Sequence, residues 1–307
     1  MVLARPFALS VLIGLACASR LAAQDVPPAA DGQPPQRGGP GAGQTIIVTG
    51  DRPESRGERR REATRYFDSH AVPTRSGQYA RWHHPICVRT WGLPLDLNAR
   101  ISTRIMDIAD RLGIATNRSE LCAPNVRIGF TNTPQAMIES AVARNRMIIG
   151  FHYASQHDRI VQVRQPVQAW YVTTTLGAAG VDYIDDVQDR APGGRAGSRL
   201  SAGIANGLHH VLILADTNVV AGEEVGPIAE LLAFVTFAPT PIAEGCDEAP
   251  TILNLMNPAC PPPRRPTELT QEDLAYIRAL YRTTPDLAPI LQRSAIVGNI
   301  VNQLDDH

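Results

Sequence analysis

The stretch from Glu223 to Arg282 constrains the fold of this 307-residue chain more than any other. Its first part, Glu223–Ala238, is an apolar run that predicts a helix buried on most sides. Two cysteines then close the loop Cys246–Cys260, and the last segment, Thr270–Arg282, predicts a helix whose first turn Thr270 can cap. The stretch therefore predicts an apolar helix and a capped helix joined by a cysteine-closed loop.

The N-terminus predicts an export signal over residues 1–23. Arg5 precedes the short apolar run Phe7–Ala16, and small residues then lead to a cleavage site after Ala23. The run is too short to span a bilayer comfortably. A buried N-terminal helix and a lipid anchor at Cys17 are the alternatives. The export interpretation places the mature chain in the periplasm or outside the cell.

Four cysteines remain once this segment is removed, and an even number in an exported chain predicts two disulfides. Three pairings are possible. The favoured pairing is Cys87–Cys122 with Cys246–Cys260, because each bond closes a modest loop around a single element. A four-cysteine zinc site is the alternative, but the cysteines lack the C-x-x-C spacing typical of such sites.

The segment before the main domain divides into two parts. Residues 24–55 are predicted to be a disordered, low-complexity linker, because they are rich in Pro, Gly, Ala and Gln. Within it, Thr45–Gly50 resembles a short segment of TonB-dependent outer-membrane receptors, although a strand added to the domain is the favoured interpretation. Residues 56–80 are predicted to be a lead-in with a charged helix, Arg56–Ser69. This helix is either solvated or meets an anionic lipid or partner surface.

Residues 81–307 are predicted to form a single α+β domain, a mixed sheet packed by helices. The predicted strands are Trp82–Leu93, Asn125–Thr131, Val167–Thr175 and His209–Asp216. The predicted helices are Leu95–Leu112, Pro134–Arg146, Glu223–Ala238, Thr270–Arg282 and Ala288–Leu304. The Gly-rich segment Gly177–Arg199 is predicted to be a long loop.

The order of strand, apolar helix, loop with a methionine and capped helix resembles the C-terminal half of zincin metalloproteases, most closely metzincins of the matrixin kind. In that family an H-E-x-x-H helix precedes a turn of the S-I/V-M type and an L-S/T-x-x-D-x-x-x-I-x-x-L-Y helix. Here Thr251-Ile252-Leu253 stands at the turn, with Met256 three residues later. The last helix matches the family pattern at Leu269, Thr270, Asp273, Ile277, Leu280 and Tyr281.

The zinc-binding motif of that family is missing. Two histidines four residues apart would bind zinc from adjacent turns, with the glutamate beside them as general base. Aligned on Glu230, the two ligand positions are Ala229 and Ala233, and alanine cannot bind a metal. The resemblance therefore implies a degenerate zincin-like fold, a pseudoenzyme without its zinc. No metal or other cofactor is expected.

Four residues are candidates for catalysis without a metal: Glu230, Asp216, His209 and His210. This hypothesis predicts that one of the histidines lies within hydrogen-bond reach of Asp216 or Glu230. The two adjacent histidines are expected to point to opposite faces of a strand, so that they cannot chelate one metal together. The chain has no G-x-S-x-G elbow and no Gly-rich phosphate-binding motif.

The net charge of −1 gives no reason to expect nucleic acid as a partner. The favoured function is an exported, non-catalytic binding or structural domain, whose partner is a protein or another component of a Gram-negative envelope. One alternative is a periplasmic hydrolase that uses non-metal residues. The other is a peripheral membrane or TonB-associated module that uses the basic helix.

Overall fold

The computed structural model describes residues 55–150, 152–177, 182–184, 197–241 and 245–305. The predicted export signal, the Cys17 anchor and the run Thr45–Gly50 lie outside these residues, as does the linker apart from Ser55. Most of the predicted loop Gly177–Arg199 also lies outside them.

The elements follow the predicted order closely. The strands are β1 (Val88–Trp91), β2 (Val126–Thr131), β3 (Val167–Leu176), β4 (Asp182–Ile184) and β5 (Ala205–Asp216). The helices are α1 (Arg56–His70), α2 (Leu95–Arg111), α3 (Pro134–Arg144), α4 (His157–Val161), α5 (Thr217–Val220), α6 (Val225–Phe237), α7 (Gln271–Arg282) and α8 (Pro289–Asp305). Short 3-10 turns are η1 (Arg146–Ile149), η2 (Ala154–Gln156), η3 (Ile252–Asn254) and η4 (Pro262–Arg264).

The described strands form one mixed sheet in the order β1-β2-β5-β3-β4. Strands β1, β2 and β5 run parallel, whereas β3 is antiparallel to β5 and β4 is antiparallel to β3. This confirms the prediction of an α+β domain with a mixed sheet packed by helices. Strand β4 lies inside the segment predicted to be a loop, where the Gly-rich composition hid a short antiparallel partner for β3.

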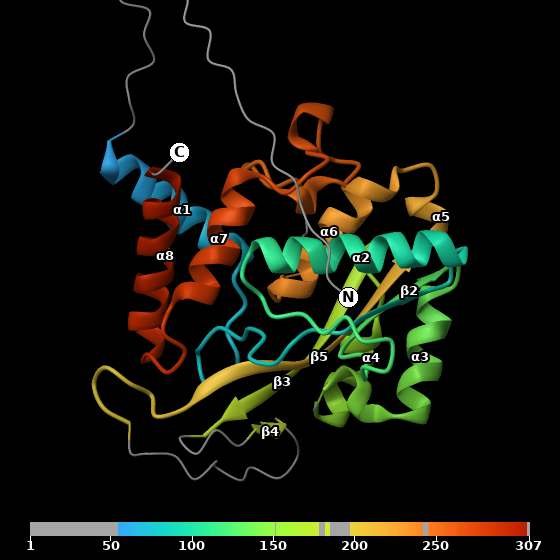
Figure 1. Ribbon diagram of the computed structural model, residues 1–307, viewed down its shortest axis with the longest axis horizontal. Coiled ribbons are helices and arrows are strands. Elements are labelled where there is room, and N and C mark those ends of the chain that lie inside the picture. Colours follow the sequence, from blue (N-terminus) through green and yellow to red (C-terminus); the bar gives the residue numbers. More distant parts are fainter. Residues whose placement is uncertain (1–54, 151, 178–181, 185–196, 242–244, 306–307) are drawn as a thin grey trace, which may run out of the picture. The chain divides into compact units, whose positions relative to one another are not determined.

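Helices cover both faces of the sheet (Figure 1). Helices α2 and α6 share the larger hydrophobic core with one face of β5, through Val211, Ile213 and Ala215. Helix α3 and the α4 segment share a smaller core with the other face, through Leu212 and Leu214. Strand β5 is therefore buried on both sides, which explains why its sequence is a continuous apolar run rather than an alternating one.

Helix α2 confirms the predicted helix Leu95–Leu112, and its buried residues recur at helical spacing. Ile101, Ile105 and Ile108 are buried, and Gly113 ends the helix in a left-handed conformation with φ of 76°. Leu95 begins the helix but is 87% exposed. It lies on the first turn of the helix and lines a groove beside β1.

Helix α1 is solvated on one face only. Its buried residues are Ala63, Tyr66, Phe67 and His70. The exposed face forms ion pairs with α8: Arg59 lies 2.6 Å from Asp305, and Arg293 lies 2.7 Å from Asp68. The charged sequence therefore concealed an apolar stripe at helical spacing that packs α1 against α7 and α8 (Figure 1).

Helix α6 is buried at every position from Pro227 to Phe237. Its last carbonyls, which lack partners within the helix, accept hydrogen bonds from three side chains of distant segments. Tyr171 donates to Val235 at 2.6 Å, Trp82 to Thr236 at 2.8 Å, and Tyr281 to Phe237 at 2.9 Å. These donors let an apolar helix end inside the protein without unpaired carbonyl groups.

Both predicted disulfides, Cys87–Cys122 and Cys246–Cys260, are present. Disulfides persist in oxidising compartments, so the bonds indicate that the folded domain works outside the cytosol. None of the helices in the described residues has the length and apolar character needed to cross a bilayer.

Candidate functional site

The middle of α6 is where the zincin resemblance places two zinc ligands. Ala229 and Ala233 are both fully buried, with 0% of their surface exposed. Their methyl groups are part of the large hydrophobic core shared with α2 and the sheet. Among the described residues, no group of three His, Cys, Asp or Glu side chains is arranged to hold a metal ion.

Glu230 is buried and paired with an arginine of α2. Its carboxylate is 4% exposed, and one oxygen accepts from Arg104 Nε at 2.9 Å and Nη2 at 2.5 Å. The other oxygen accepts from the Leu269 backbone N–H at 3.3 Å. Since both oxygens are occupied, Glu230 joins α2 to α6 and to the segment that enters α7.

The remaining catalytic candidates lie apart along β5. His210 Nε2 donates to the Ile148 carbonyl at 3.0 Å, while Asp216 accepts from the Asn218 N–H at 2.9 Å. Six residues of extended strand between His210 and Asp216 span about 20 Å. The structure therefore brings neither histidine within hydrogen-bond reach of Asp216, and Glu230 is engaged elsewhere.

The two histidines of β5 differ from the expected opposite-face arrangement. The pairing of β3 with β5 slips at this point: Val172 pairs with His210 and Thr173 pairs with Leu208, so His209 is an extra residue in a β-bulge. The two imidazole centroids lie only 5.7 Å apart. Burial lowers the pKa of His210, with a smaller contribution from the neighbouring His209. Strand alternation fails here because a bulge re-aims one side chain.

A cleft of about 820 Å³ lies between α1 and the Cys246–Cys260 loop. Its notable polar residue is His70, which is 3% exposed and stacks on Tyr66 with ring centroids 4.2 Å apart. His70 Nε2 lies 3.1 Å from the Asp247 carboxylate, and Nδ1 lies 2.7 Å from the Tyr66 carbonyl. Sequence reasoning missed this pair, although the spacing of Ala63, Tyr66 and His70 already marks one face of α1.

His70 bridges two segments through its two ring nitrogens. Nδ1 lies against the Tyr66 carbonyl of its own helix, and Nε2 lies against the Asp247 carboxylate of the loop. The His70–Asp247 pair therefore holds the end of α1 against the cysteine-closed loop.

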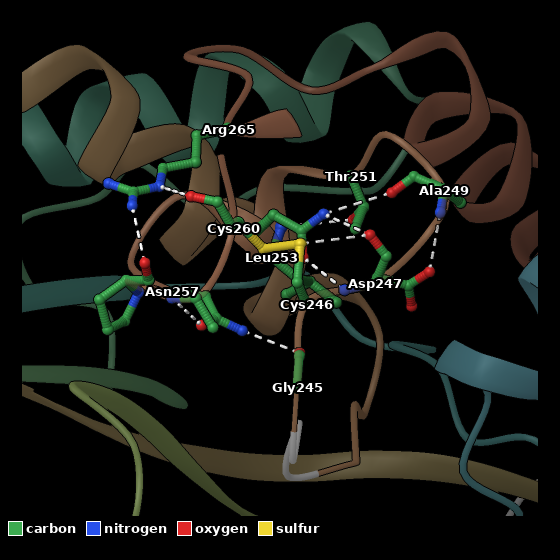
Figure 2. The surroundings of a disulfide bond; sticks show 12 residues. Gly245, Cys246, Asp247, Ala249, Thr251, Leu253, Asn257, Cys260 and Arg265 are labelled. Atoms are coloured by element: carbon green, nitrogen blue, oxygen red, sulfur yellow. Dashed lines mark hydrogen bonds between the residues drawn. A yellow bond between two sulfur atoms is a disulfide. The ribbon is translucent and has the colours of Figure 1, made fainter. Parts of the chain in front are cut away.

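The loop itself is fixed by its own hydrogen bonds (Figure 2). The Asp247 N–H donates to Asn254 Oδ1 at 3.0 Å, and the Ala249 N–H donates to Asp247 Oδ1 at 3.0 Å. On the other side of the disulfide, Arg265 Nε donates to the Cys260 carbonyl at 2.7 Å. These contacts turn a short irregular segment into a rigid wall of the cleft.

The Asp247 carboxylate is expected to make stability depend on pH in the acid range. Its hydrogen bond with His70 holds its pKa below the ordinary value of 3.8. A lowered folded-state pKa contributes stability that is present above the unfolded-state pKa and is lost as pH falls through the folded-state value. The difference in unfolding free energy between the wild type and Asp247→Asn should therefore shrink below pH 3.8.

Urea unfolding over a pH series measures this difference. Glu248→Gln, in the exposed position next to Asp247, is the control for removing one carboxylate from the same loop. A difference for Asp247→Asn that grows as the pH falls below 3.8 contradicts the assignment.

The buried Glu230 of α6 is paired with Arg104, and the buried His70 beside the cleft is paired with Asp247. These pairs join α1, α2 and α6 to the segments beside them. Comparison of the chain with models of known families, with curated proteins and with solved structures finds no match.

Proposed function

We propose that this chain is an exported, metal-free binding domain that keeps a zincin-like scaffold in its C-terminal half. The proposal rests on the side chains that stand in the middle of α6. Ala229 and Ala233 fill the two ligand positions with buried methyl groups, and Glu230 is held by Arg104. A helix in this state has neither the ligands nor the free carboxylate that zinc-dependent hydrolysis needs.

The contacts of Asp273 support the scaffold part of the proposal. This fully buried carboxylate of α7 accepts from Thr251 Oγ1 at 2.7 Å and from the Ile252 N–H at 2.9 Å. It also accepts from the Thr270 N–H at 2.9 Å and from the Tyr66 hydroxyl. The turn at 251–253 and the last helix are the two parts that resemble metzincins, and one side chain joins them.

The binding part of the proposal is supported by the bonds that hold irregular surface segments in one conformation. A binding site that is already formed in the free protein loses less conformational entropy when a partner arrives. The two disulfides and the His70–Asp247 pair fix irregular segments that face solvent. Rigid loops beside a helix that lacks the zinc ligands favour recognition over turnover.

The proposal is tested by the metal content of the oxidised protein and by the effect of a chelator. We expect elemental analysis to find less than one zinc in ten chains, and EDTA or added zinc to leave the melting temperature unchanged. A metal that binds only the folded chain would raise that temperature, because ligands stabilise the state that binds them. Stoichiometric zinc, or stability that a chelator removes, would falsify the proposal.

A further inference from the structure

The outer edge of β1 carries backbone groups that the described residues leave without a partner. Just before the strand, the Ile86 N–H donates outward to the Ala115 carbonyl at 2.9 Å, and the Ile86 carbonyl accepts from the Asn117 N–H at 2.8 Å. Backbone groups of a strand alternate between its two edges, so those of Val88 and Thr90 also point outward. No hydrogen bond within the described part of the chain reaches them.

A groove of about 430 Å³ runs along this edge. One wall is α2, which presents the small side chains Ala99, Ser102 and Thr103, and the other wall is the loop 117–122. The four residues of β1 span about 13 Å, which matches four residues of an added extended strand. The groove therefore has the dimensions and the backbone chemistry of a site for strand addition.

One exposed leucine lines this groove, and a second lies in the loop that forms the opposite wall. Leu95 at the start of α2 is 87% exposed, and Leu121 in the opposite loop is 95% exposed. They are among the most exposed large apolar side chains of the described residues. An added strand presents alternate side chains to such contacts, and their burial favours binding.

The charge beside the edge indicates the chemistry of the partner. Arg89 Nη2 donates to the Glu120 backbone carbonyl at 3.3 Å, and Arg127, its neighbour in register on β2, donates to the Pro124 carbonyl at 3.3 Å. Neither arginine forms an ion pair with a described carboxylate. An acidic side chain opposite Arg89 on an added strand would supply the missing counter-charge.

The same charge argues against a second copy of the chain as the occupant. Two β1 edges paired with each other would place Arg89 of each copy near Arg89 of the other, and like charges on paired strands are destabilising. The disulfide Cys87–Cys122 joins the start of β1 to the loop that forms one wall, so the groove is present before a partner arrives.

We propose that the outer edge of β1 binds an extended acidic peptide segment of a partner protein, which adds to the sheet as a further strand. This inference rests on the proposed binding role and names the partner class. The incoming backbone pairs with Val88 and Thr90, its acidic side chain faces Arg89, and a flanking apolar side chain contacts Leu95.

A display library of random seven-residue peptides, selected on the oxidised full-length protein, is the test. We expect enrichment of sequences with an acidic residue between β-branched or apolar residues. Synthetic peptides of the enriched sequences should bind Arg89→Glu at least tenfold more weakly than the wild type. Exchange of the acidic residue for lysine should restore binding to Arg89→Glu. Arg60→Glu, at an exposed position of α1, is the matched charge reversal and should leave affinity within twofold.

Hydrogen exchange gives a second readout, since the amides of Val88 and Thr90 should exchange more slowly in the complex. Enrichment of no sequence, or of sequences that bind Arg89→Glu equally well, overturns the inference. Self-association of the wild type that Arg89→Glu abolishes also overturns it, because the occupant is then a second copy. If the protein is free of zinc but selects no such peptide, only this inference is wrong. If the protein holds stoichiometric zinc, the proposed function is wrong, whatever the peptide experiments give.

Discussion

Reduction of both disulfides is expected to unfold most of the molecules in solution. The bonds join residues 35 and 14 apart in sequence. On the loop-entropy model, they stabilise the fold by about 4 and about 3 kcal/mol respectively. Their sum of about 7 kcal/mol is comparable with the whole free energy of unfolding of an ordinary domain. The cause is the larger conformational freedom that the unfolded chain regains when the loops open.

Paired alanine variants separate the two contributions. Cys87→Ala with Cys122→Ala should cost more than Cys246→Ala with Cys260→Ala, because the first bond closes the longer loop. Denaturant unfolding under oxidising conditions measures both losses, and a reductant should not destabilise the variant that lacks all four cysteines. Equal stability of the wild type in oxidant and in reductant would be incompatible with this account.

Replacing Asp273 with alanine is expected to lower the free energy of unfolding by about 4 kcal/mol. The substitution leaves the Tyr66 and Thr251 hydroxyls and the N–H groups of Ile252 and Thr270 without their shared acceptor. Buried donors without a partner are costly, and the first turn of α7 also loses its capping box. Burial and the neighbouring Asp273 carboxylate raise the pKa of Tyr66, so its hydroxyl remains a proton donor at neutral pH.

Two variants calibrate this effect. Asp273→Asn keeps the size of the side chain and one acceptor oxygen, so an intermediate loss is expected. Glu272→Ala removes a carboxylate from the same turn of α7. This carboxylate interacts only weakly with the helix dipole, so the substitution should lower the free energy of unfolding by less than about 1 kcal/mol. A loss for Asp273→Ala no larger than that for Glu272→Ala would show that the Asp273 network is not a main support of the fold.

Much of the domain could be predicted from sequence because its elements have strong local signals. The period of Ile101, Ile105 and Ile108 predicts α2, and the apolar run around Leu212 predicts a buried strand. The disulfide pairing was predicted because each cysteine has a near neighbour in sequence across a single element. These features depend on residues close together along the chain.

The features that sequence reasoning missed depend on distant contacts or on departures from a regular pattern. Charge on α1 hid the buried position of His70, whose partner Asp247 lies far along the chain. The bulge at His209 arises from a register slip between β5 and β3, and the local sequence does not predict such a slip. The groove beside β1 requires the order of strands in the sheet, because its walls come from α2 and from the loop 117–122.

The carbonyl end of α6 has a consequence for the order in which the chain folds. Its donors come from residues 82, 171 and 281, so the last of them becomes available only when α7 has been made. Until then the Phe237 carbonyl at the end of α6 lacks its donor and α7 does not yet cover the helix, and exposed apolar segments of incomplete chains are prone to aggregate. Completion of the cap on this helix is therefore a late step in the folding of the chain.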